Sequence, residues 1–191
     1  MTVIGLLYPA FLGSLIYNPI ETAFKHYQNS ETRDVPSFAS EGHLDELFLL
    51  AALIVHFVFD FVYVTDEDPE AGYDWLMFIA DIAIVTMLFL SIQYVLRFSG
   101  PQSAGAPVWL ILLGTKLAAF IWELADARHH DWESDKDGAV VIDLAFCYVY
   151  AFGMLCFHGI PWLLGAIVAI DAAAYVIYDK FYKCRVTTRA G

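Results

Sequence analysis

The sequence predicts an all-α, polytopic membrane protein built as a helical bundle with five transmembrane helices, or six if the N-terminal segment also crosses. Composition is the first observation: 59% of the 191 residues are hydrophobic and only 17% are charged, against about 25% charged residues in a soluble domain. The second observation is that five apolar runs approach the length of about 20 residues that a helix needs to cross a bilayer. The third is that these runs carry ionisable side chains, which are costly in lipid and indicate a polar interior.

The five apolar runs are separated by residues that interrupt helices. They cover residues 47–64, 75–98, 108–127, 140–157 and 161–182. Ser40 suits a helix N-cap before the first run, and Gly159 with Pro161 separates the last two. Residues 1–17 are apolar but short and contain Pro9, so a sixth span, a re-entrant piece and an interfacial anchor all remain open.

Three parts of the chain follow from these runs. Residues 1–45 form an N-terminal apolar segment with a polar or amphipathic connection, residues 46–182 form the transmembrane bundle, and residues 183–191 form a tail. Basic residues favour the cytoplasmic side of a membrane. The side that holds the C-terminus has Lys180, Lys183, Arg185, Arg189, Arg128 and Lys136, and the other side has Lys25, Arg33 and Arg97. We therefore expect an inner or plasma membrane protein with a cytoplasmic C-terminus.

The charge and motif content excludes several functions. A net charge of -12 argues against nucleic acid as a partner; we expect membrane lipid, and either a second copy of the chain or another subunit of a membrane complex. No Walker loop, HExxH, GxSxG or selectivity-filter motif occurs, so no cofactor is expected. Three cysteines without CxxC spacing do not predict a disulfide framework.

His56 and Asp60 lie four residues apart in the first long helix, so they share a face. An imidazole beside a carboxylate can transfer a proton or bind a metal, and the same pair could instead hold two helices together. The spacing is similar to the His-x-x-x-acid pair of sterol-isomerase membrane proteins over this one helix, although the later motifs do not line up. That similarity implies an acid and a base at an apolar cavity.

Lys116 is expected to pair with acids on neighbouring helices. Asp60, Asp81 and Glu123 should all lie in the cytoplasmic half of the membrane, and Glu123 is on the lysine's own face because seven residues are nearly two helical turns. One lysine among three acids leaves an excess of negative charge, which would hold a proton or attract a cation. The alternative is an ion-pair network that only fixes helix packing.

Two further acids lie in the last two runs. Asp171 is mid-span, shares a face with Tyr175, and is flanked by alanines that allow close helix approach; we expect one buried polar contact there. Asp143 is near a helix start, where a carboxylate suits the helix dipole.

The connection between the third and fourth runs contains weak candidates for a metal site. They are His129, His130 and Asp131. Adjacent residues on a helix point about 100° apart, so the two histidines could bind one ion only from a loop, and a solvated loop is the better interpretation.

The leading hypothesis is therefore a membrane protein that moves or senses protons or cations, as a channel, transporter or sensor. Its ion- or proton-handling candidates are His56, Asp60, Asp81, Lys116, Glu123 and Asp171. The sequence favours a non-enzymatic role over a catalytic one. The alternatives are a non-catalytic interaction or assembly subunit, and a lipid- or sterol-binding protein or isomerase that uses His56 and Asp60.

Overall fold

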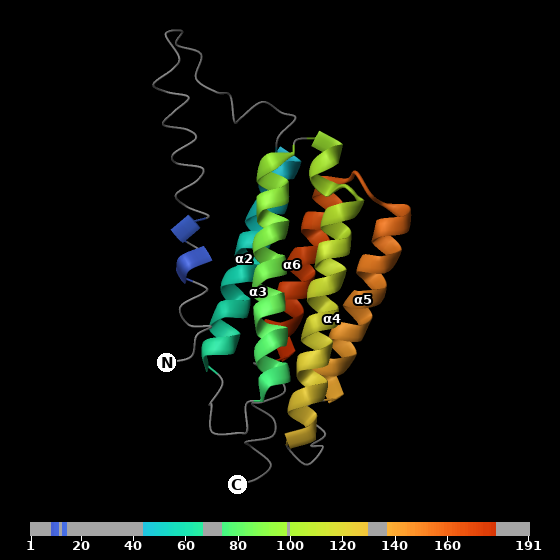
Figure 1. Cartoon of the computed structure of the whole chain (residues 1–191). Coiled ribbons are helices and arrows are strands. Elements are labelled where there is room, and N and C mark those ends of the chain that lie inside the picture. Colours follow the sequence, from blue (N-terminus) through green and yellow to red (C-terminus); the bar gives the residue numbers. More distant parts are fainter. Residues whose placement is uncertain are drawn as a thin grey trace.

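The computed structural model describes residues 9–11, 13–14, 44–66, 74–98, 100–129 and 137–178. Within them the chain is helical, with no β-strand. Five long helices and one short 3-10 helix follow one another (Figure 1). They are α2 (Leu44–Asp66), α3 (Trp75–Arg97), η1 (Gly100–Ala104), α4 (Ala106–His129), α5 (Asp137–Cys156) and α6 (Pro161–Tyr178).

The long helices coincide with the five apolar runs of the sequence. Four segments of the described part of the chain are long and apolar enough to cross a membrane: Trp75–Arg97, Pro101–Asp126, Gly138–Cys156 and Pro161–Tyr178. The chain is thus all-α and, by helix composition, an integral membrane protein that crosses the bilayer several times. The fifth run is a helix as well, α2, and its role as a further span is taken up under Proposed function.

The N- and C-terminal predictions concern residues that lie largely outside the described ones. Residues 9–11 and 13–14 are helical, and the Phe11 ring stacks on Phe89 of α3 with centroids 4.7 Å apart. The prediction of a possible span at residues 1–17 and that of a tail at 183–191 both fall largely on residues outside the described part of the chain.

Consecutive helices run in opposite directions, so the bundle has two distinct ends (Figure 1). At the α4–α5 end, α2, α4 and α6 finish while α3 and α5 begin. At the η1 end lie η1 and the turn between α5 and α6. Gly159 in this turn has φ 85°, a backbone conformation that favours glycine.

The η1 end is held by one carbonyl group. The Ala104 carbonyl oxygen accepts hydrogen bonds from the Gly159 N–H, at 2.8 Å, and from Trp109 Nε1, at 3.1 Å. At the opposite end the Asp74 carboxylate caps α3 by accepting from the N–H groups of Leu76 and Met77. The start of α3 and the turn between α5 and α6 are thus each held by polar contacts.

The helices pack closely in pairs that are not all consecutive in sequence. α3 packs against α4, α4 against α5, and α2 against α6, while α5 and α6 touch each other much less. In Figure 1, α6 stands between α2 and α3 on one side and α4 and α5 on the other. Because α5 and α6 have few apolar contacts with each other, polar contacts between them gain importance.

Most of the core is apolar, and its best-buried part lies toward the η1 end. Fully buried side chains there include Val108 and Trp109 of α4 and Leu164 and Val168 of α6. Gly153 of α5 lets the Trp109 ring lie directly on its backbone, since a Cβ at that position would overlap the ring. This half of the bundle is filled by large apolar side chains.

Candidate functional site

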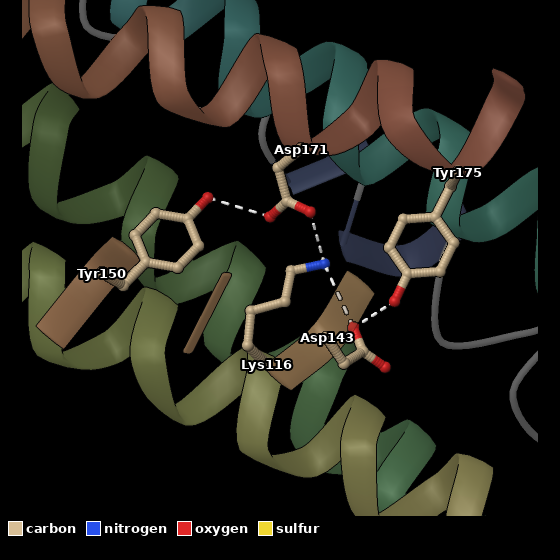
Figure 2. A network of polar contacts seen from close by, with 5 residues as sticks. All are labelled: Lys116, Asp143, Tyr150, Asp171 and Tyr175. Atoms are coloured by element: carbon tan, nitrogen blue, oxygen red, sulfur yellow. Dashed lines mark hydrogen bonds and ion pairs between the residues drawn. The ribbon is translucent and has the colours of Figure 1, made fainter. Parts of the chain in front are cut away.

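A buried lysine joins three helices at the middle of the bundle. Lys116 Nζ of α4 lies 2.7 Å from Asp171 Oδ1 of α6 and 3.6 Å from Asp143 Oδ1 of α5. Figure 2 shows the ammonium group between the two carboxylates. The side chains of both aspartates are fully buried, and that of the lysine is 4% exposed. Because these side chains are buried away from water, the three charged groups are stabilised by one another and not by solvent.

Each of the two carboxylates also accepts a hydrogen bond from a tyrosine. The Tyr150 hydroxyl of α5 donates to Asp171 Oδ2 at 2.9 Å, and the Tyr175 hydroxyl of α6 donates to Asp143 Oδ1. Each helix thus supplies one acid and one tyrosine to the other (Figure 2). We call Lys116, Asp143, Tyr150, Asp171 and Tyr175 the lysine cluster.

The reciprocal arrangement follows from the antiparallel course of α5 and α6. Residues that face each other across an antiparallel hairpin have position numbers with a nearly constant sum. For Tyr150 and Asp171 the sum is 150 + 171 = 321, and for Asp143 and Tyr175 it is 143 + 175 = 318. Both pairs therefore belong to one helix register, which brings the acids to opposite sides of the lysine.

Aromatic rings enclose the ammonium group on its remaining sides. Lys116 Nζ is 4.5 Å from the centroid of Tyr175 and 5.7 Å from that of Phe146. A cation over a ring face is stabilised by the ring quadrupole, more so when it is desolvated. The cluster is thus built to keep Lys116 charged.

The cluster carries more negative than positive charge. With one lysine and two aspartates ionised, the net charge is +1 − 2 = −1. Asp171 is contacted by Lys116 and by the Tyr150 hydroxyl. Asp143 Oδ2 is buried and accepts no hydrogen bond from the residues that the structure describes. Buried polar atoms are usually paired, so this oxygen marks the place at which the cluster is unsaturated.

His56 of α2 reaches the cluster from the fourth helix. It is 7% exposed, interacts with the backbone of Val168, and is electrostatically coupled to Asp171 and Lys116. Its Nδ1 atom is buried, and none of the described residues gives it a hydrogen-bond partner. The helix pairing explains this position, because α2 packs along α6.

The structure shows two partners of Lys116 that the sequence did not assign to it. The described ion pairs go to Asp143 and Asp171, and the expected approach of Lys116 to Asp60, Asp81 or Glu123 stays a prediction. Those expectations rested on depth in the membrane, and depth does not fix which helices are neighbours. Lys116 faces α5 and α6, so acids on those helices reach it directly.

The three expected acids nonetheless lie inside the same half of the bundle. Asp60 is partly buried on α2 and electrostatically coupled to Lys116. Asp81 of α3 is 2% exposed, and Glu123 of α4 is 6% exposed. Glu123 is coupled to Tyr175 of the cluster, so it extends the polar region toward the α4–α5 end.

Tyr150 is a site residue that the sequence analysis missed. The signal was present, since an acid and a tyrosine occur on each side of the Gly159–Pro161 break at matching distances from it. Aligning the two helices as a hairpin would have paired Tyr150 with Asp171. Asp143, which was interpreted as a helix-dipole residue, would have met Tyr175 by the same alignment.

The weak metal candidates lie outside the part of the chain whose side chains are described. His130 and Asp131 fall in the connection after α4, and His129 is the last residue of that helix. Among the described residues, no group of three or more His, Cys, Asp and Glu side chains is placed to hold a metal ion.

Fold and site together define the class: a polytopic membrane protein whose interior holds a lysine bridged to two buried aspartates. No protein-family model matches the chain, and no curated protein or solved structure matches it either. The functional argument therefore depends on the geometry of the cluster.

Proposed function

We propose that the chain is a five-helix membrane protein that binds and releases a proton at the lysine cluster, in proton sensing or transport. The observation that carries the proposal is the excess of one carboxylate around Lys116 in a site with almost no exposure. α2 would be the fifth span: it has 23 residues and contains the apolar run 47–64.

Charge balance supports a proton site. An uncompensated charge in a bilayer costs about 2.5–3.5 kcal/mol on insertion scales, and that cost acts on the net charge of −1. A single proton shared by the aspartates removes it. Asp143 Oδ2 is buried and has no hydrogen-bond partner within the described part of the chain, so it can receive this proton without breaking a described contact.

The position of Lys116 favours a proton over a metal ion. The ammonium group already occupies the space between the two carboxylates, 2.7 Å from one and 3.6 Å from the other. A metal ion that used the same oxygens would have to displace a cation of like sign. A proton adds to one oxygen and leaves the lysine in place.

His56 is the second group suited to the same proton. An imidazole nitrogen can accept a proton, and His56 Nδ1 is buried and has no hydrogen-bond partner among the described residues. A proton that moves between the aspartates and Nδ1 of His56 would change which helices carry charge. We assign His56 the role of titrating partner.

Infrared spectroscopy of the purified protein tests the proposal. A protonated aspartate has a carboxylic C=O band that an ionised one lacks, so the band should appear and disappear as pH is varied. Asp143→Asn and Asp171→Asn should each abolish it, because the remaining aspartate then balances Lys116. Asp45→Asn, at an exposed carboxylate in the first turn of α2, is the matched control and should leave it unchanged.

A structural role is the second candidate, and one observation favours it. α5 and α6 make few contacts with each other, and the two tyrosine–aspartate hydrogen bonds join these helices. The cluster would then set the assembly of the bundle or of a membrane complex. A pH-dependent carboxyl signal that is identical in wild type, Asp143→Asn and Asp171→Asn, all folded, would decide for this role.

A further inference from the structure

The lysine cluster has different neighbours toward the η1 end of the bundle and toward the α4–α5 end. On the face of α4 that carries Lys116, the residues toward the η1 end are Leu112 and Trp109, 2% and 0% exposed. Toward the α4–α5 end, the same face carries Glu123, two turns away. On this face of α4, ionisable side chains therefore continue from the cluster in one direction only.

The other two helices of the cluster repeat this asymmetry. On α6, Val168 and Leu164 lie on the η1 side of Asp171 and are fully buried, whereas Tyr175 lies on the other side. On α5, Gly153 with the Trp109 ring against it lies beyond Tyr150. The η1 half is thus an apolar plug made of Trp109, Leu112, Leu164 and Val168.

A series of polar groups leads from the cluster toward the α4–α5 end. The Tyr175 hydroxyl donates to Asp143, and the Tyr175 ring centroid lies 4.5 Å from Lys116 Nζ. Glu123, 6% exposed, is about two turns further along the face of α4 that carries Lys116. Asp126 follows Glu123 by about one turn and is partly exposed. These groups give a proton successive positions between the end of the bundle and Asp143.

Other ionisable groups surround this route on each neighbouring helix. α2 contributes His56 and Asp60, both coupled to Lys116 or Asp171, and α5 contributes Cys147, coupled to Asp143. α3 contributes Asp81, buried in its first half. These groups also lie at the level of the cluster or on its α4–α5 side, so they preserve the asymmetry.

We propose that the cluster exchanges its proton with one face of the membrane only, the face at the α4–α5 end, and that Glu123 and Tyr175 relay it to Asp143. The chain then senses the pH of that compartment and does not conduct protons across the bilayer. This inference rests on the proposed function, because it presupposes a proton at the cluster.

Vesicles with the protein in a single orientation test which face has access. Two preparations of opposite orientation are made, and a tag at the C-terminus, cleaved from outside, identifies each. The outer pH is stepped while the inner pH is held. The carboxyl band should follow the outer pH only where the α4–α5 end faces out, and a pH gradient across these membranes should not decay faster than in protein-free vesicles.

The vesicle experiment distinguishes a failure of one-sided access from a failure of the proton site. A band that follows the outer pH in both orientations, or a gradient that the protein dissipates, overturns one-sided access and leaves the proton site intact. A band that responds to pH in neither preparation overturns the proton site itself.

Glu123→Gln tests the relay. Transfer of the wild-type protein into D2O shifts the carboxyl band at a rate set by proton exchange. Relay by a positioned acid or base is worth factors of about 10²–10⁴ in other systems, so Glu123→Gln should slow the shift at least about tenfold. The titration midpoint should stay within about one pH unit, and Glu123→Asp should restore the rate.

Two results would contradict the relay. One is an exchange rate in Glu123→Gln equal to that of wild type and of the Asp45→Asn control, which changes an exposed acid at the η1 end. The other is a slower exchange that Glu123→Asp does not restore although both variants are equally stable, since that result would assign Glu123 a packing role.

Discussion

Tyr150 and Asp171 mark the inner limit of the polar interior. The Tyr150 hydroxyl donates to Asp171 Oδ2 at 2.9 Å, and the indole of Trp109 meets the same tyrosine ring edge-on, with centroids 6.2 Å apart. One face of Tyr150 therefore belongs to the charged cluster and the other to the apolar core. The boundary between the charged cluster and the apolar half of the bundle passes through this residue.

Tyr150→Phe should lower stability and leave the fold unchanged. The variant removes the only hydroxyl that donates to Asp171 Oδ2 among the described contacts and leaves a buried carboxylate oxygen unpaired. Hydrogen bonds to charged groups are worth about 1.5–3 kcal/mol, which is the expected loss in unfolding free energy. Tyr148→Phe is the control because Tyr148 is 71% exposed on the same helix, and equal losses in the two variants would contradict the assignment.

Lys116→Met should be more damaging than either aspartate substitution. It leaves two buried carboxylates without a counter-charge, and removing one partner of a buried ion pair costs about 3–5 kcal/mol. The folded variant would relieve this cost by taking up protons that the unfolded chain does not need, so its stability should fall as pH rises. Thermal unfolding across pH measures the slope, and a pH-independent stability equal to that of wild type would refute the charge-balance argument.

The helices were predictable because their signals are local. Residues 75–98 were expected as one run and form α3 (Trp75–Arg97), and the break at Gly159 and Pro161 separates α5 from α6 as expected. Apolar length and helix-breaking residues are properties of a contiguous segment. They need no knowledge of which helices become neighbours.

The partners of Lys116 were not predictable by the same reasoning. A helical face and a depth can be assigned to one residue, but an ion pair depends on the relative rotation and adjacency of two helices. The pairing of α2 with α6 and of α4 with α5 is set by shape, including the contact of Gly153 with Trp109. Asp171 was correctly expected to make a buried contact, while its partner Tyr150 required the register of the hairpin.

Gly153→Ala should destabilise the η1 half of the bundle. A Cβ at this position would overlap the Trp109 ring, whose indole is held by its hydrogen bond to Ala104. Overpacking of this kind typically costs about 1–3 kcal/mol. Gly13→Ala is the control because nothing lies within 4 Å of its Cβ position, and thermal unfolding of the two variants side by side is the measurement.

The orientation of the chain is a separate prediction. Six basic residues near the helix ends on the side of the C-terminus, against three on the other, place the α4–α5 end in the cytoplasm. Cys184, in the tail beyond α6, should therefore react with an impermeant thiol reagent only after intact cells are opened. A variant with Cys147→Ser and Cys156→Ser removes competing thiols, and labelling of Cys184 from outside would reverse the orientation.

Asp171→Asn separates a proton site from a packing contact. The amide keeps the shape of the side chain. Its oxygen can still accept from Lys116 while its NH2 group donates to the Tyr150 hydroxyl, so the unfolding free energy should change by less than about 1 kcal/mol, below the cost of an unpaired buried group. The substitution removes one negative charge, and the remaining pair of Lys116 and Asp143, 3.6 Å apart, is neutral without a proton. The pH-dependent carboxyl band should therefore vanish from a protein that is still folded. If the band persists in folded Asp171→Asn, the titrating proton lies on another acid, and Asp60→Asn and Asp81→Asn become the decisive variants because both residues lie in the same half of the bundle.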